Sequence, residues 1–202
     1  VVFHKLTGSG NDFVMLDGRH TSHEQWPVER IAAVCDRRNG IGADGLVILD
    51  PVAENAVRMT YWNSDGSLAP MCGNAALCST RLSAALELAD PGGMTLVTGA
   101  GEFRTRCVGD GDVAELNLPD VTLPKPLDIP LVDGESAIMM GVVGVPHVIC
   151  RVNDIAAVDL PQRGRELRYH EAVGSGGANV NFFGPAATSS SSGGGGAAAG
   201  PG

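Results

Sequence analysis

The sequence predicts an α/β protein in which one nearly apolar helix is buried and wrapped by sheet. Three stretches carry this prediction. Residues 56–62 alternate apolar and polar side chains, as a half-buried strand does. Residues 27–38 place apolar residues at helical spacing behind a proline that suits a first turn. Residues 75–88 contain only two charged side chains, so their helix is expected to be buried and wrapped by sheet.

The other elements follow from shorter patterns. Val2–Lys5 and Phe13–Leu16 are expected strands on either side of a glycine-rich loop. The segment Gly40–Gly45 spells G-x-G-x-x-G, but it follows a helix and opens a strand, the reverse of a dinucleotide site, so we reject that function. The remaining expected elements are strands at Leu46–Leu49, Met94–Thr98, Glu102–Val108, Val113–Leu118, Ser136–Val143, His147–Val152 and Ala178–Phe183, and a short helix at Arg163–His170.

The chain divides at a proline-rich stretch. Pro119–Pro130 holds four prolines and is typical of a linker. We therefore expect an N-terminal half over residues 1–118 and a partial second half over 119–183. Residues 184–202 are mostly serine, glycine and alanine, a composition that cannot bury a core, so no structure is expected there.

Composition narrows the possible partners. The 202 residues carry a net charge of −9, which argues against nucleic acid or an anionic membrane as a partner. No apolar run approaches the length of a membrane span, and the first residues lack a signal-peptide core. Five irregularly spaced cysteines are typical of a reduced, cytoplasmic protein.

The most informative stretch is Asn63–Asn74, a turn that ends in Cys72-Gly73-Asn74 at the start of the apolar helix. Backbone N–H groups at a helix start lack intrahelical partners and lie at the positive end of the dipole. A carboxylate can bind there, and a thiolate is stabilised there. The alternative is that Cys72 is a small buried hydrophobe in an ordinary turn. Cys35 and Cys78 fall at packing positions of their helices.

Six blocks of the sequence, taken together and in order, resemble diaminopimelate epimerase, from the N-terminus to about residue 183. The blocks are Gly8-Ser9-Gly10-Asn11-Asp12-Phe13, Gly40-Ile41-Gly42-Ala43-Asp44-Gly45-Leu46, Asn63-Ser64-Asp65-Gly66-Ser67, Met71-Cys72-Gly73-Asn74, Gly144-Val145-Pro146-His147 and Asn179-Val180-Asn181-Phe182.

This resemblance implies two pseudo-symmetric α/β domains, each a curved mixed sheet around a central helix. It implies an isomerase without a cofactor that converts LL-diaminopimelate to meso-diaminopimelate for lysine and cell-wall precursors. One cysteine removes the α-proton as thiolate and another returns one as thiol. It also implies a small amino-acid substrate, a homodimer and a cytoplasmic location.

The resemblance assigns roles to seven residues. Cys72 would be one of the two thiols, and His147 would lie near the thiols and tune their protonation. The residues that would bind the substrate are Asn11, Asn63, Gly73, Asn74 and Asn179. Hydrogen bonds to the substrate carboxylate that strengthen as charge develops would stabilise a carbanion-like transition state.

The sequence also departs from the family pattern. Ala75 and Leu77 stand where the family has Gly and Arg, and Val145 stands where it often has Asn. These changes leave open a relative that acts on another amino acid. The family's second catalytic cysteine block has no counterpart after Phe183, and Cys107 and Cys150 lie in strand patterns. We therefore expect the second half to be incomplete, so that the sequence is unfinished or its product is inactive.

Three other functions are compatible with parts of the pattern. One is an inactive relative that only binds an amino acid. Another is a cysteine hydrolase that uses Cys72 and His147. The third is a zinc site formed by Cys72, Cys78 and His147, although this set lacks the usual short ligand spacing. We expect no metal.

Overall fold

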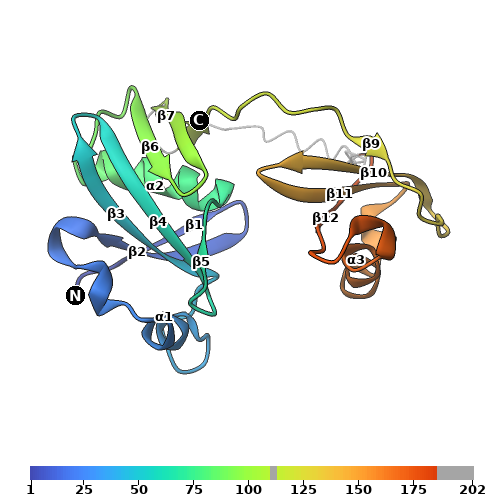
Figure 1. Ribbon diagram of the computed structural model, residues 1–202, viewed down its shortest axis with the longest axis horizontal. Coiled ribbons are helices and arrows are strands. Elements are labelled where there is room, and N and C mark those ends of the chain that lie inside the picture. Colours follow the sequence, from blue (N-terminus) through green and yellow to red (C-terminus); the bar gives the residue numbers. More distant parts are fainter. Residues whose placement is uncertain (110–112, 186–202) are drawn as a thin grey trace, which may run out of the picture. The chain divides into compact units, whose positions relative to one another are not determined.

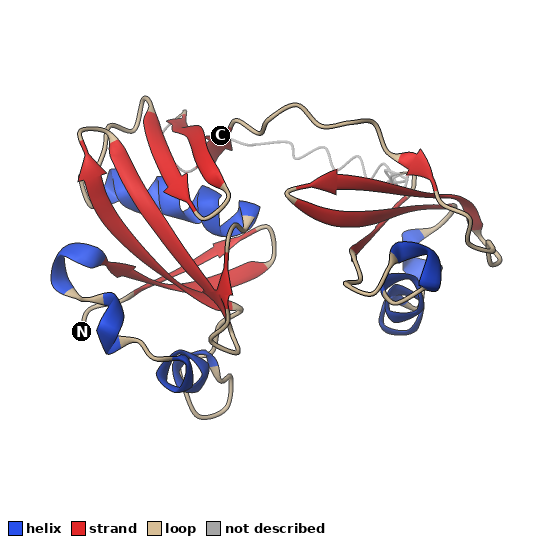
Figure 2. Ribbon diagram, in the orientation of Figure 1, coloured by secondary structure: helices blue, strands red, loops and turns tan. Residues whose placement is uncertain are grey.

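The computed structural model describes residues 1–109 and 113–185. The chain forms two compact units, Val1–Asp120 and Val121 onward, and each is described by itself. Figures 1 and 2 show the helices and strands of both units. Most of the expected low-complexity tail, residues 186–202, lies outside the described residues.

The elements of unit 1 are β1 (His4–Gly8), β2 (Asn11–Asp17), η1 (Gly18–His20), η2 (His23–Gln25), α1 (Val28–Cys35), β3 (Gly45–Ala53), β4 (Ala56–Asn63), β5 (Leu68–Ala69), α2 (Gly73–Ala85), β6 (Met94–Thr98), β7 (Gly101–Val108) and β8 (Val113–Leu116). Those of unit 2 are β9 (Lys125–Pro126), β10 (Glu135–Val143), β11 (Val145–Val152), η3 (Ile155–Ala157), α3 (Leu160–Arg168), η4 (Glu171–Val173) and β12 (Asn179–Phe183).

Unit 1 is a single mixed sheet that curves around α2 (Figure 1). The strand order is β1-β2-β3-β4-β6-β7-β8, with β5 paired to β4. The pairs β2–β3 and β4–β6 are parallel, and the other pairs are antiparallel. Both edge strands, β1 and β8, contact α2. The prediction of a mixed α/β fold with a buried helix is therefore confirmed.

The sequence of α2 suits an enclosed position. Small residues let the strands approach closely, and two hydroxyls on the helix bond to its own carbonyls instead of water. Ser79 Oγ donates to Ala75 O at 2.7 Å, and Thr80 Oγ1 lies 2.9 Å from Ala76 O. The buried residues of the helix are Ala75, Ala76, Cys78, Ser79, Thr80, Leu82 and Ser83.

The outer face of β2 and β3 is covered by α1. Alternate residues of these strands pack against α2 on one side and against Ile31 and Trp26 on the other. Because both faces are buried, β2 and β3 are nearly continuous apolar runs. The helix ends at Cys35, three residues before the expected end, because the Asp36 carboxylate accepts from the N–H groups of Arg38 and Asn39. That turn competes with further helix.

Unit 2 is a four-stranded sheet in the order β12-β11-β10-β9. Helix α3 contacts β12, and its Leu167 is fully buried in the core of the unit. The expected linker Pro119–Pro130 is partly wrong, because β9 pairs with β10 and Ile129 is buried. Proline at an edge strand needs no ladder N–H, so a proline-rich stretch can still end a sheet. In the described part of the chain, none of the helices is long and apolar enough to cross a membrane.

Candidate active site

Cys72 is the N-cap residue of α2 and is partly exposed. Its carbonyl accepts the first helical hydrogen bond, from Ala76 N at 2.9 Å. No side chain caps this helix end, and its first turn contains no acidic residue. The thiol therefore stands beside backbone N–H groups at the positive end of a buried helix, an arrangement that favours an anion.

The two glycines near Cys72 differ in their surroundings. A Cβ at Gly8 would lie 2.9 Å from Cys78 Sγ and 3.2 Å from Asn74 O, so Gly8 lets the β1–β2 hairpin approach the start of α2. A Cβ at Gly73 would meet nothing within 4 Å. Packing within unit 1 therefore does not require glycine at position 73, and the space beside the Gly73 Cα is open.

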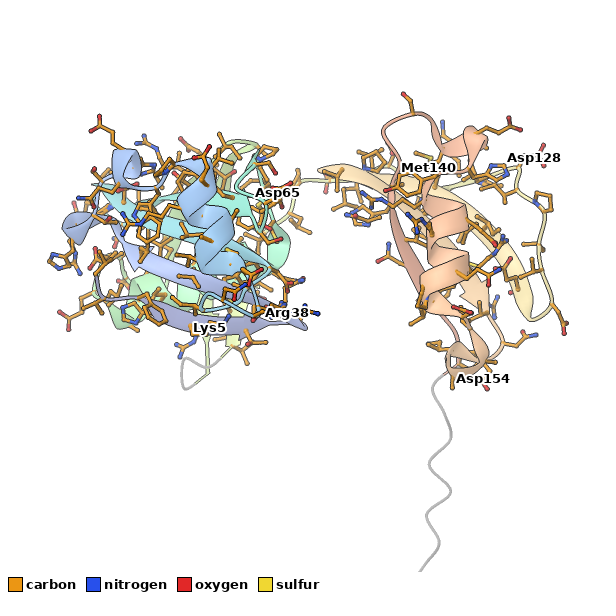
Figure 3. The ribbon with its side chains drawn as sticks, turned by 90° about the horizontal axis from the view of Figure 1, so that it is seen from below. Lys5, Arg38, Asp65, Asp128, Met140 and Asp154 are labelled. Atoms are coloured by element: carbon orange, nitrogen blue, oxygen red, sulfur yellow. The ribbon has the colours of Figure 1, made fainter. Side chains whose placement is uncertain are left out.

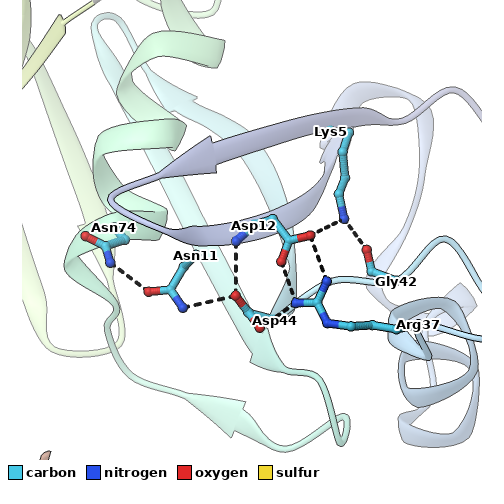
Figure 4. Close-up of polar contacts among 7 residues, drawn as sticks. All are labelled: Lys5, Asn11, Asp12, Arg37, Gly42, Asp44 and Asn74. Atoms are coloured by element: carbon cyan, nitrogen blue, oxygen red, sulfur yellow. Dashed lines mark hydrogen bonds and ion pairs between the residues drawn. The ribbon is translucent and has the colours of Figure 1, made fainter. Parts of the chain in front are cut away.

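The β1–β2 turn brings Asn11 to Asn74. Ser9 and Gly10 both have positive φ, of 50° and 90°, as a two-residue hairpin turn requires. Gly8 then pairs with Asn11, and Asn74 Nδ2 donates to Asn11 Oδ1 at 2.7 Å. Two of the predicted substrate-binding residues, 63 positions apart, thus contact each other at the start of α2 (Figure 4).

A charged network extends from Asn11 away from the helix (Figure 4). Asn11 Nδ2 donates to Asp44 Oδ2 at 3.0 Å, and Arg37 bridges Asp44 Oδ1 and Asp12 Oδ1 at 2.7 Å each. Lys5 pairs with Asp12 at 2.7 Å and also donates to the carbonyl of Gly42. Hydrogen bonds from Arg37 and then Lys5 hold the pKa of Asp12 well below its usual range.

Sequence reasoning did not single out Arg37 or Asp44. Asp44 lies inside the G-x-G-x-x-G stretch that we rejected as a nucleotide site. The stretch does form the helix-to-strand turn between α1 and β3, as predicted. The available signal was a carboxylate between glycines next to a buried strand, but its partners Asn11 and Asp12 are more than 30 residues away.

Asn63 lies at the end of β4, and its side chain is held locally. Its Oδ1 accepts from the Tyr61 hydroxyl at 3.1 Å, and its Nδ2 donates to Ser67 Oγ at 3.0 Å. Tyr61 is 7% exposed. Its pKa is raised mainly by burial and, to a smaller extent, by the neighbouring Cys72. Asn63 is therefore linked to the surroundings of Cys72 through Tyr61.

All five cysteines are unpaired. Cys35, Cys78 and Cys150 are buried, as expected of packing residues, and Cys107 is partly exposed in β7. Burial raises the pKa of Cys78 to about 11. Burial and, to a smaller extent, the negative charge of Glu135 raise the pKa of Cys150 to about 12. These two buried thiols stay protonated at neutral pH.

In unit 2, His147 and Asn179 lie on adjacent parallel strands and are register partners. The ring Nδ1 of His147 lies 3.1 Å from Asn181 Nδ2, which also donates to Val148 O at 3.3 Å. Because an amide N–H faces Nδ1, the neutral ring carries its proton on Nε2. Arg168 donates to Asn179 Oδ1 at 3.3 Å, which leaves the Asn179 amide nitrogen for another partner.

A cavity of about 400 Å³ lies elsewhere in unit 2, where β10 begins and β11 ends. Its lining includes Glu135, Arg163 and Asp154. Asp154 and Met140 lie toward opposite ends of this unit (Figure 3). His147 precedes Val152 by five residues, or roughly 17 Å of strand, so the cavity is separate from His147. No metal-binding cluster of three or more His, Cys, Asp or Glu side chains occurs within residues 1–109 and 113–185.

Sequence comparisons match the chain to one family. Residues 3–121 match the family model described as diaminopimelate epimerase. The chain is 45% identical over 185 residues to the diaminopimelate epimerase of Gemmatimonas aurantiaca, covering 91% of this chain and 66% of that protein. It is 35% identical over 196 residues to that of Aquifex aeolicus, covering 92% and 69%. The chain thus spans about two thirds of the length of these relatives.

Structural comparison shows the same type of fold. A phenazine biosynthesis protein of the PhzF family from Bacillus anthracis has a TM-score of 0.59 at 16% identity, over 76% of this chain and 55% of that one. A hydroxyproline epimerase from Agrobacterium vitis has a TM-score of 0.51 at 14% identity, over 82% and 56%. These likenesses show the fold, and the sequence matches show that the chain belongs to the diaminopimelate epimerase family.

Proposed function

We propose that this chain takes part in the epimerisation of an amino-acid α-carbon, with LL-diaminopimelate and meso-diaminopimelate as the substrate pair and without a cofactor. The observation that carries the proposal is the position of Cys72, a partly exposed thiol at the uncapped start of a buried helix, with open space beside Gly73. The names and sequence similarity of the relatives support the choice of substrate.

The chemistry requires a base that removes the α-proton and groups that bind the adjoining carboxylate. In this proposal the Cys72 thiolate takes the proton from the α-carbon onto Sγ, and the N–H groups of Gly73 and Asn74 bind the carboxylate. Their hydrogen bonds strengthen as negative charge moves from the α-carbon to the carboxylate, which stabilises the transition state. Asn11, Asn63 and Asn179 bind the polar ends of the substrate, and His147 tunes the protonation of the thiols.

Inversion also needs an acid on the opposite face of the α-carbon. Among the described cysteines, the buried thiols of Cys35, Cys78 and Cys150 are unsuited to that role, and Cys107 lies within a strand. Exchange at one face needs only Cys72, because the proton on Sγ exchanges with solvent before it returns to the same face of the carbanion. Exchange of the α-hydrogen therefore tests the first half of the reaction by itself.

The test is incubation of the full chain with LL- and meso-diaminopimelate in deuterium oxide, followed by proton NMR and chiral analysis. We expect the α-hydrogen signal of the substrate to decay faster than it does in buffer alone. Where only Cys72 acts, the α-carbon keeps its configuration. Proline and lysine serve as comparison substrates, because Ala75, Leu77 and Val145 differ from the family pattern. Exchange of another amino acid in preference would refute the choice of substrate. Binding without exchange would favour an inactive amino-acid-binding relative.

We also propose that the chain works as a homodimer in the cytoplasm, as the resemblance to the family implies. A mass of twice 20.8 kDa is expected by light scattering of the purified chain. A single-chain mass across the micromolar range would contradict the dimer. Fractionation of cells expressing the full-length protein tests the location.

A further inference from the structure

The side chains of Asp44, Asn11 and Asn74 form a hydrogen-bonded relay that ends at the start of α2 (Figure 4). Asn11 Nδ2 donates to Asp44 Oδ2 at 3.0 Å, and Asn74 Nδ2 donates to Asn11 Oδ1 at 2.7 Å. Asn74 is the second residue of α2, two positions after the thiol. The relay therefore connects a carboxylate in the α1–β3 turn to the candidate binding residues at the start of the helix.

The Asp44 carboxylate determines which end of each asparagine amide donates a hydrogen bond and which end accepts one. An ionised carboxylate only accepts hydrogen bonds, so the end of Asn11 that faces Asp44 must be its NH₂ group. The carbonyl end of Asn11 then faces Asn74 and requires the NH₂ group of Asn74. Asn74 is left with its Oδ1 and one N–H for a ligand. Without an acceptor at position 44, the side-chain amide of Asn11 can flip by about 180°. The Oδ1 and N–H that Asn74 presents to a ligand are then no longer held in one orientation.

Asp44 itself is held from several sides. Its Oδ2 also accepts from Asp12 N at 3.1 Å, and its own N–H donates to Asp12 O at 2.9 Å. Its Oδ1 accepts from Arg37 at 2.7 Å. These contacts hold the carboxylate in place independently of its hydrogen bond with Asn11, so it can act as a rigid reference for the asparagine pair.

We propose that Asp44 is a positioning residue, which sets the amide orientation of Asn11 and, through Asn11, that of Asn74 at the start of α2. The effect on the binding of an amino acid rests on the proposed function, whereas the orientation of the amides does not. Asp44 acts through the hydrogen bond that it accepts from Asn11, and its charge pair with Arg37 holds it in place.

Two substitutions separate these contributions. Asp44→Ala removes the acceptor and the charge, whereas Asp44→Asn removes the charge but keeps a carbonyl oxygen for Asn11 and Asp12 N. The matched control is Asp90→Ala, which removes an exposed carboxylate from the α2–β6 connection of the same unit, where it accepts from Gly92 N at 2.7 Å. Thermal unfolding of all three variants checks that unit 1 remains folded.

The first measurement is the side-chain amide spectrum of Asn11 and Asn74 in the full ¹⁵N-labelled chain, without ligand. We expect Asp44→Ala to shift the side-chain amide signals of both residues, and Asp44→Asn and Asp90→Ala to leave them close to the wild type. Equal shifts in Asp44→Ala and Asp44→Asn would show that the charge pair alone matters, and would overturn the proposal. So would unchanged signals in Asp44→Ala.

The second measurement is the dissociation constant of meso-diaminopimelate by calorimetry. Loss of one oriented hydrogen bond predicts affinity weakened about tenfold in Asp44→Ala, with most of it restored in Asp44→Asn. If the amide signals respond as expected but even the wild type binds no amino acid, the proposed function fails and the positioning role stands. If the wild type binds and both variants weaken binding equally, the positioning role fails.

Discussion

The Cys72→Ser variant is expected to lose α-hydrogen exchange by about 100-fold to 10,000-fold, the usual contribution of one general base. A serine hydroxyl is a far weaker base than a thiolate at neutral pH, although it fits the same space. The exchange rate in deuterium oxide, measured at saturating substrate, is the readout. Cys72 is partly exposed at the end of a helix, so the substitution is expected to leave the fold unchanged.

The matched control for this substitution is Cys107→Ser, since Cys107 is the other partly exposed cysteine. It lies in β7 and is expected to retain wild-type exchange. Equal exchange in the wild type and Cys72→Ser would rule out Cys72 as the base. Loss of exchange in both variants would point to a general effect of removing a thiol, and would be checked against thermal unfolding.

The Glu135→Leu variant is expected to destabilise unit 2 by about 3–5 kcal/mol, the usual effect of removing one partner of a buried ion pair. The Glu135 side chain is 3% exposed, and that of Arg163 is 14% exposed. Arg163 Nε and one terminal nitrogen donate to the two carboxylate oxygens at 2.8 and 2.9 Å. Hydrogen exchange of the β10 and β11 amides measures the loss. Fluorescence of Trp26 and Trp62, both in unit 1, separately measures the unfolding of unit 1.

Two controls identify the cause of this loss. Glu166→Gln removes the more exposed partner of Arg163, 49% exposed, and is expected to change stability by about 1 kcal/mol or less. The double variant Glu135→Leu, Arg163→Met removes both buried charges and is expected to recover much of the stability. If the double variant is as unstable as Glu135→Leu, the effect comes from packing and not from an unpaired charge.

The same pair predicts how unit 2 responds to acid. Burial disfavours the charged form of Glu135, but hydrogen bonds from Arg163 and the N–H of Val132 outweigh it, so the pKa of Glu135 is lowered. A lowered pKa means that the pair stabilises the fold fully above the unfolded-state value of about 4.3. This contribution is lost as the pH falls through the folded value. Glu135→Leu should therefore show a smaller decrease in stability below about pH 4.3 than the wild type.

Local patterns were sufficient to predict most elements. The alternation in residues 56–62 and the lack of charge in residues 75–88 predicted β4 and the enclosed α2, because burial in a curved sheet selects for these patterns. The end of α1 was placed too late, because a side chain that competes with the helix backbone, here that of Asp36, leaves the apolar spacing unchanged. The predicted linker was too long, because the prolines around β9 are typical of a linker and not of a strand.

The site was only partly predictable for a different reason. Cys72 could be placed at a helix start from its neighbours in sequence, and the β1–β2 hairpin followed from its glycines. The contacts of Asp44 with Asn11, and of Arg163 with Glu135, join positions 33 and 28 residues apart. A single sequence does not state which carboxylate meets which amide or guanidinium, because that depends on strand register and on how α1 and α3 pack.

The enclosure of α2 has a consequence for synthesis on the ribosome. The helix contacts β1, which begins at His4, and β8, which ends at Leu116. Its small side chains give it few interactions of its own, so it depends on strands from both ends of this segment. Its enclosure cannot be completed until position 116 has left the exit tunnel, so this half of the chain folds only after most of it has been synthesised.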